Sequence, residues 1–160
     1  MKNKIVKIVV IVCLIVIIID QGSKLLLSQL KPEGIEMTEN TGMAFGFNDG
    51  NTKNIFLTIF VLFIIISFLK NQRNELDTKT IIAVALALGG GISNLIDRIF
   101  RGGVLDFIKI WKFPVFNIAD ICICIAWALL IIFLFIYTNK KDVIKGVDIE
   151  ELKVKEKKEK

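Results

Sequence analysis

Four long apolar segments alternate with short charged ones along this chain, and this alternation constrains the fold more than any other feature. The apolar segments cover about residues 5–19, 55–69, 81–96 and 115–137. A helix needs roughly 17–25 residues to cross a bilayer, so polar flanking residues must extend the first three segments. The sequence therefore predicts an all-α integral membrane protein with four transmembrane helices.

The four segments and their connections indicate one domain. We expect a four-helix membrane domain over residues 1–139 and a basic tail over residues 140–160. The tail holds eight lysines and six acidic residues, so it contributes +2 to the chain's net charge of +5. A basic run beside a membrane helix is typical of a segment that lies on a membrane surface. We therefore expect contact with lipid and no binding of nucleic acid.

Short basic segments indicate the orientation in the membrane. The N-terminal segment and the connection 70–79 are both short and basic, and such segments stay in the cytoplasm. Four helices would then place both termini, and so the tail, in the cytoplasm. The two larger connections, about 21–54 and 98–114, would face outward.

The stretch Gly89–Asp120 carries three carboxylates, Asp97, Asp106 and Asp120, between apolar segments. Ionisable groups are costly beside or inside a membrane, so they indicate a functional site. The chain has no histidine, which excludes Ser-His-Asp and Cys-His nucleophilic systems and histidine-ligated zinc. We expect no metal ion and no other cofactor, and chemistry that depends on paired carboxylates.

Two further groups of polar residues share a helix face. Asp20 and Lys24 are four residues apart and can pair, either as a brace for a site or as a simple interfacial ion pair. Asn94, Asp97 and Arg98 are spaced at i, i+3 and i+4, which predicts a connected network at the outer end of the third helix. The alternative is an Asp–Arg pair that only anchors the helix.

The first outer connection has the composition of short strands and turns. Asn40 lies beside Gly42, where a sharp turn is expected, and its side chain can bond a neighbouring backbone group. A small sheet on the membrane surface would let Met43, Phe45 and Phe47 contact lipid or an apolar substrate. The alternative is an ordinary hairpin between two helices.

Asp106 lies in the second outer connection, and Asp120 is expected in the first turn of the fourth helix. Asn117 shares a face of that helix with Asp120, and Pro114 is expected in the same first turn. Two neighbouring carboxyls share a proton, so one can activate water while the other polarises a carbonyl. This is the chemistry of an aspartic protease. Paired aspartates also fit a small proton- or ion-coupled carrier, although charges gathered near one face disfavour transport.

Five motifs in order carry a resemblance to a known family, lipoprotein signal peptidase, also called signal peptidase II. They run from the first apolar segment to the start of the fourth: Asp20 with Lys24, Asn40–Gly46, Gly89–Gly90 with Asn94–Arg98, Val104–Phe107, and Phe116–Asp120. Chain length and the four-span layout also agree with the family.

The resemblance implies a bacterial aspartic endopeptidase of the cytoplasmic membrane, with Asp106 and Asp120 as the catalytic pair near the outer face. Such an enzyme removes signal peptides from prolipoproteins, cutting just before a lipobox cysteine that carries diacylglycerol. A small extracytoplasmic sheet cradles the substrate, and the antibiotic globomycin occupies the catalytic region. We expect a monomer.

The resemblance also implies residues that shape the site or contact substrate. They are Asp20, Lys24, Asn40, Gly42, Asn94, Asp97, Arg98 and Asn117. Ser93 departs from the family, which usually has glycine before the asparagine. We expect its hydroxyl to bond back to the helix backbone and leave activity intact.

Overall fold

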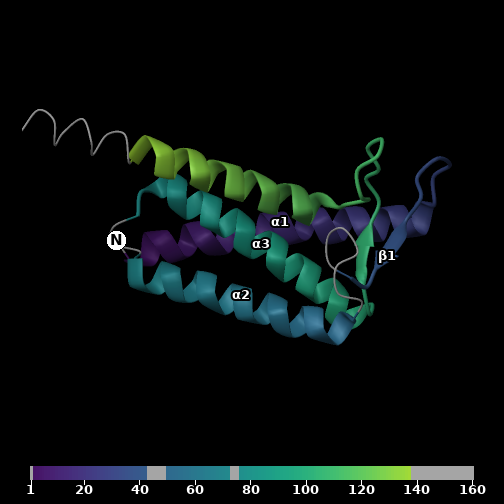
Figure 1. Ribbon diagram of the computed structural model, residues 1–160, viewed down its shortest axis with the longest axis horizontal. Helices are drawn as coiled ribbons and strands as arrows, with labels where there is room; N and C mark the ends of the chain where they lie inside the picture. The colour runs from purple at the N-terminus through teal and green to yellow at the C-terminus, as the bar shows by residue number, and fades with distance from the viewer. Residues whose placement is uncertain (1, 43–49, 73–75, 138–160) are drawn as a thin grey trace, which may run out of the picture.

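The computed structural model describes residues 2–42, 50–72 and 76–137, and within them four helices run side by side with a small sheet at one end (Figure 1). The helices are α1 (Lys2–Leu30), α2 (Asn51–Gln72), α3 (Thr78–Phe100) and a fourth helix, Ile118–Tyr137. Each is long and apolar enough to cross a membrane. The predicted all-α membrane fold with four spans is confirmed.

Helix α3 lies at the centre of the bundle because three successive glycines let its neighbours approach. A β-carbon added at Gly90 would lie 2.6 Å from the Ala119 carbonyl oxygen in the fourth helix. One added at Gly89 would lie 3.0 Å from α1, and one at Gly91 would lie 3.0 Å from Leu62 in α2. Successive residues turn by about 100° around a helix, so each glycine meets a different neighbour.

The first three helices extend beyond their apolar segments, as the membrane thickness requires. Helix α1 continues to Leu30, so Asp20 and Lys24 lie inside it and not at its end. At about 1.5 Å per residue its 29 residues span about 43 Å, well beyond a hydrocarbon core of about 30 Å.

The fourth helix begins at Ile118 and not at residue 115, so the prediction that Pro114 occupies its first turn is wrong. Asn117 caps the helix instead. Its side-chain oxygen accepts from the Asp120 amide at 2.9 Å, and the Asp120 carboxylate accepts from the Asn117 amide at 3.3 Å. This reciprocal pair is a capping box, which fixes Asp120 in the first helical turn.

The sheet consists of β1 (Thr38–Asn40) and β2 (Val104–Asp106), which pair antiparallel with Thr38 opposite Asp106. The small predicted sheet is present, but its second strand comes from the second outer connection. Met43, Phe45 and Phe47 lie outside the described residues, as does the predicted tail 140–160.

Candidate active site

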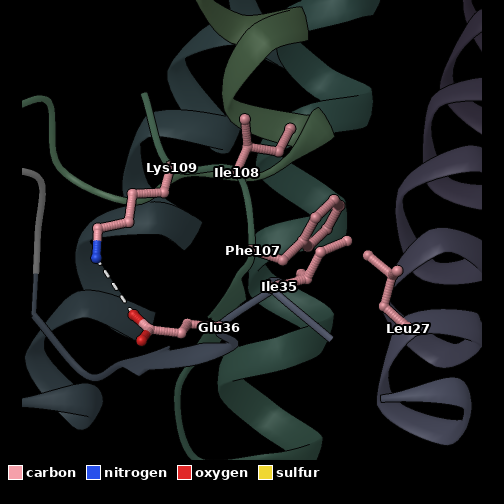
Figure 2. A pocket seen from close by; sticks show the side chains of 7 residues that line it. Leu27, Ile35, Glu36, Phe107, Ile108 and Lys109 are labelled. Carbon is pink, nitrogen blue, oxygen red and sulfur yellow. Dashed lines mark hydrogen bonds and ion pairs between the residues drawn. The ribbon is translucent and has the colours of Figure 1, made fainter. Parts of the chain in front are cut away.

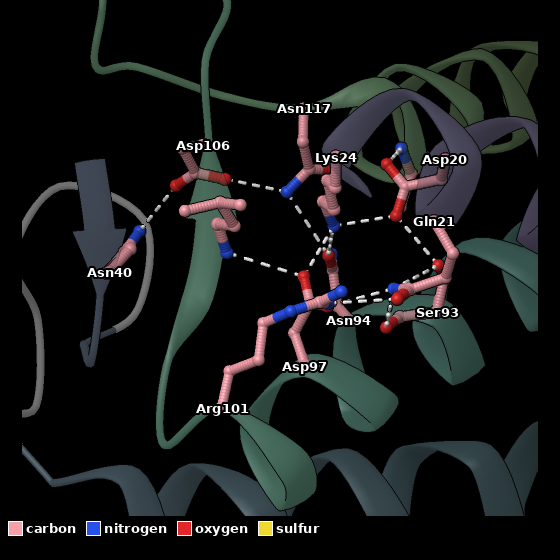
Figure 3. A network of polar contacts seen from close by, with 12 residues as sticks. Asp20, Gln21, Lys24, Asn40, Ser93, Asn94, Asp97, Arg101, Asp106 and Asn117 are labelled. Atoms are coloured by element: carbon pink, nitrogen blue, oxygen red, sulfur yellow. Dashed lines mark hydrogen bonds and ion pairs between the residues drawn. The ribbon is translucent and has the colours of Figure 1, made fainter. Parts of the chain in front are cut away.

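The ten residues singled out in the sequence gather where the sheet meets the helices, and hydrogen bonds and ion pairs join all of them into one network. Figure 3 shows the part of this network around Lys24, Asn94 and Asn117. Helices α1 and α3, strand β1 with its following turn, strand β2 and the start of the fourth helix each contribute. The residues are Asp20, Lys24, Asn40, Gly42, Asn94, Asp97, Arg98, Asp106, Asn117 and Asp120. Their roles in catalysis stay a prediction.

Asp106 and Asp120 are held by neutral N–H groups. Asp106 accepts from the Asn117 side chain at 2.6 Å and from the Asn40 side chain at 3.1 Å. Asp120 accepts from the Asn94 side chain at 2.8 Å and from the Asn117 backbone. Asn117 thus contacts both carboxylates and sets their relative position.

Burial raises the pKa of the Asp106 carboxyl to about 6, and the neighbouring charge of Asp120 acts in the same direction. The amide donors of Asn40 and Asn117 oppose this shift, because they stabilise the ionised form, but the cost of burial is larger. Only 2% of Asp106 is exposed. A carboxyl in this position can keep a proton at a pH where an exposed aspartate is fully ionised.

A second group of charges lies next to the first. The ammonium group of Lys24 lies 2.6 Å from Asp20 and 2.6 Å from Asp97, and all three side chains are fully buried. The backbone amide of Ala119 donates to Asp20 at 2.9 Å, and that of Leu105 donates to Asp97 at 3.3 Å. We call Asp20, Lys24 and Asp97 the ion cluster; it fastens α1 to α3, to the strand β2 and to the fourth helix.

Asn94 joins the ion cluster to the two aspartates. Its side-chain oxygen accepts from Lys24 at 3.4 Å and from Asn117 at 3.2 Å, while its amide donates to Asp120. The cation of Lys24 therefore acts on Asp120 through one fixed amide side chain. This arrangement leaves Asp106 and Asp120 close to the positive charge of Lys24 without forming an ion pair with it.

Comparison with known proteins decides the family. The profile of a family described as signal peptidase (SPase) II matches residues 12–136. This chain belongs to the signal peptidase II family. The lipoprotein signal peptidase of Photorhabdus laumondii is 36% identical over 150 residues, covering 82% of this chain and 90% of that protein. That of Halalkalibacterium halodurans is 33% identical over 135 residues, covering 75% and 86%.

Solved structures agree with this signal peptidase II assignment. A bacterial membrane enzyme determined by the in meso method at 2.3 Å resolution has a TM-score of 0.74 at 30% identity, covering 83% of this chain and 90% of that one. A second, determined at 1.9 Å, has a TM-score of 0.68 at 30% identity, covering 79% and 91%. The chain is therefore a peptidase with several membrane-spanning helices.

Arg98 is placed differently from the sequence-based expectation. Its guanidinium donates to the Gly42 carbonyl at 3.2 Å, and Arg101 forms the ion pair with Asp97. The i, i+4 spacing brings Arg101 onto the face of Asp97, whereas Arg98 is one residue on and points about 100° away. Asp97 joins the network through Lys24 and not through Arg98.

Ser93 also differs from its prediction. Its hydroxyl donates to the Asp20 carboxylate at 2.7 Å instead of to the helix backbone, and it accepts from the Gln21 side chain at 3.1 Å. Gln21 donates further to Asp97 at 2.9 Å. Ser93 has this partner because the close packing of α3 on α1 places a carboxylate beside it.

Two asparagines in the first turn of α2 bond to backbone groups next to the site residues, and the sequence analysis missed both. Asn54 is buried and donates to the Thr41 carbonyl at 2.9 Å, which fixes the chain between Asn40 and Gly42. Asn51 donates to the Arg98 carbonyl at 2.8 Å. Amides that bond to backbone carbonyls in the next element leave no pattern within one segment, so no signal identified them.

A cavity of about 660 Å³ lies beside the site, between the end of α1, the turn before β1 and the segment after β2 (Figure 2). Leu27, Ile35 and Phe107 meet at its apolar side, and an ion pair of 3.2 Å between Lys109 and Glu36 spans its polar side. The lining residues are Leu27, Gly34, Ile35, Glu36, Phe107, Ile108 and Lys109.

Proposed function

We propose that this chain is an aspartic endopeptidase that removes signal peptides from diacylglyceryl-modified prolipoproteins. The cut falls just before the lipidated cysteine of the lipobox. The observation that carries the proposal is the pair Asp106 and Asp120, both held by neutral amides, with the pKa of Asp106 raised to about 6. The relatives reported above are lipoprotein signal peptidases by name.

The proposed mechanism uses one proton shared between two carboxyls. The ionised carboxylate accepts a proton from water, and the resulting hydroxide adds to the scissile carbonyl. The protonated carboxyl donates a hydrogen bond to that carbonyl oxygen, which lowers the energy of the developing oxyanion. A proton then passes to the leaving amine as the C–N bond breaks, and neither metal nor another cofactor is required.

The remaining residues fit roles of position and contact. Asn40, Asn94 and Asn117 orient the carboxylates, and Asp20, Lys24 and Asp97 fix the helices that carry them. Arg98 and Asn94 would line the site and contact substrate, and Gly42, whose carbonyl accepts from Arg98, supports it. The charged groups of the ion cluster are bonded to one another, so the cluster supports the site and does not react.

The proposed setting is the bacterial cytoplasmic membrane, with both termini in the cytoplasm, the site near the outer face and a monomeric enzyme. Single cysteines at Asn48 and Asn74, in a background without native cysteines, test the orientation. Asn48 should label from outside in intact cells and Asn74 only after permeabilisation. The opposite pattern would invert the topology, and light scattering in detergent tests the monomer.

The direct experiment is cleavage of a diacylated lipobox peptide by the purified protein. We expect cleavage before the modified cysteine, insensitivity to chelators and no turnover of the same peptide without its lipid. The carrier alternative is disfavoured by the family and predicts ion flux into proteoliposomes in place of cleavage. Flux without peptide cleavage would overturn the proposed function.

A further inference from the structure

The two aspartates are joined by a short antiparallel hairpin, residues 107–116, which we call the linking hairpin. Its base is closed by two backbone hydrogen bonds between Ile108 and Phe116, at 2.8 and 3.0 Å. Its tip is a turn in which the Phe113 amide donates to the Ile110 carbonyl at 2.9 Å. Figure 1 shows the hairpin running crosswise to the helices at the end of the bundle that holds the sheet.

The tip of this hairpin presents large apolar side chains to the outside. Trp111 is 81% exposed, Phe113 64% and Ile110 54%. The backbone of Trp111 is in the left-handed region at φ 46°, which is uncommon for a bulky residue, and Lys112 lies 5.1 Å from the centre of its ring. The hairpin therefore holds a mostly exposed indole on a strained backbone, and strain of this kind clusters at functional sites.

We propose that the tip of the linking hairpin inserts into the headgroup region of the bilayer leaflet at this end of the bundle. The fourth helix begins two residues after the hairpin, and its first two turns carry the exposed apolar side chains Ile121 and Ile125. Tryptophan favours the membrane interface, and lysine can extend its ammonium group to lipid phosphates. This continuity with a membrane-length helix favours lipid over a protein partner.

Insertion of the tip would fix the depth of both aspartates. Asp106 directly precedes the hairpin, and Asn117, which contacts both aspartates, directly follows it. A hairpin anchored at its tip therefore holds the two carboxylates at one level relative to the lipid. This inference concerns the membrane surface and can be tested without measuring peptide cleavage.

The chain has two tryptophans, which makes the test direct. Trp127→Phe leaves Trp111 as the reporter, and Trp111→Phe leaves Trp127, which lies in the middle of the fourth helix, Ile118–Tyr137. Each protein is reconstituted in phosphatidylcholine–phosphatidylglycerol vesicles that contain lipid brominated near the headgroup or near the end of the acyl chain. Trp111 should be quenched more by the shallow bromine, and Trp127 more by the deep one.

Two results would overturn the inference. One is a Trp111 that emits as an indole in water and is quenched by iodide but not by brominated lipid. The other is a Trp111 that neither iodide nor brominated lipid quenches, because protein would then cover it.

Replacing the rest of the tip tests whether it inserts as a unit. In the Trp127→Phe protein, Ile110→Gln with Phe113→Gln should shift Trp111 emission to longer wavelength and weaken quenching by the shallow bromine. Ile35→Gln is the matched control, since Ile35 is also exposed at this end of the bundle but lines the cavity beside the site. Equal shifts from the tip variant and the control would contradict insertion of the tip.

Discussion

The ion cluster and the aspartate pair each contain two aspartates at the same end of the bundle, yet the partners of these aspartates differ. Asp20 and Asp97 share the cation of Lys24 at 2.6 Å, with all three side chains fully buried. Asp106 and Asp120 accept from the amides of Asn40, Asn94 and Asn117. Among the described residues, neither of them forms an ion pair.

This difference assigns the ion cluster to the stability of the fold and the aspartate pair to the proposed chemistry. A carboxylate paired with a buried cation is a structural contact, since removing either partner would leave the other charge buried and unpaired. A carboxylate held by neutral amides can exchange its proton, because the amides orient it in either state. Asn94 contacts both groups, so the fixed charges set the position of the exchangeable ones.

The strongest way to break the ion cluster is to remove its cation. Lys24→Met leaves Asp20 and Asp97 buried without their shared partner, and breaking such a pair costs about 3–5 kcal/mol. We expect a large fall in thermal stability in detergent and in the yield of folded protein. Lys109→Met is the control, because its ion pair with Glu36 is largely exposed and contributes at most about 1 kcal/mol. Equal losses from both variants would contradict this account of the cluster.

Asp97→Asn tests whether the ion cluster positions the site or takes part in the reaction. The amide keeps the shape of the side chain, and Lys24 keeps Asp20 as a partner. We expect membrane insertion to remain and turnover to fall by on the order of 100-fold or less, as for a misplaced catalytic group. A loss as complete as that of Asp106→Asn, in well-folded protein, would make Asp97 part of the reaction.

Ser93→Ala removes one hydrogen bond from the cluster. The hydroxyl donates to a buried carboxylate at 2.7 Å, and bonds to charged groups contribute about 1.5–3 kcal/mol. We expect a moderate fall in melting temperature with peptide cleavage retained, since Asp20 keeps Lys24 and the Ala119 amide. Ser28→Ala is a matched control, because that exposed hydroxyl bonds only to its own helix backbone. A catalytic defect without a loss of stability would contradict the role of Ser93.

The pH dependence of stability should show the smallest effect, and it comes from Asp106. Its pKa is about 6 in the folded protein and about 4 in the unfolded chain, so the folded state binds the proton more tightly. The resulting stabilisation is complete below about pH 4 and is lost as the pH rises through about 6. Melting temperatures from pH 5 to 7.5 should show this loss in the wild type and not in Asp106→Asn. Identical pH profiles would contradict the raised pKa.

Sequence reasoning located the spans and gathered the site residues because polar side chains stand out in apolar segments. The i, i+4 spacing predicted the pair of Asp20 with Lys24. The same rule applied to Asp97 would have pointed to Arg101, and the spacing of Asn117 and Asp120 is that of a capping box. Both spacings are visible in the sequence, but Asp97 was paired with Arg98, and Asn117 and Asp120 were interpreted only as sharing a helix face.

Other contacts depend on packing that no local pattern encodes. The bond from Lys24 to Asp97 requires α1 and α3 to lie as close as Gly89 permits. The pairing of β1 with β2 joins residues more than 60 positions apart, at a register that neither strand specifies alone. The partner of Ser93 could be identified only after that packing was known.

The central claim is that Asp106 and Asp120 act as one proton-sharing unit. Turnover of a diacylated lipobox peptide by Asp106→Asn, Asp120→Asn and the double variant tests it most directly, in protein shown to be folded. Each single change should lower turnover by several orders of magnitude, and the double variant should be barely worse than either one. A single variant that cleaves at nearly the wild-type rate, or losses that simply multiply in the double variant, would contradict the account.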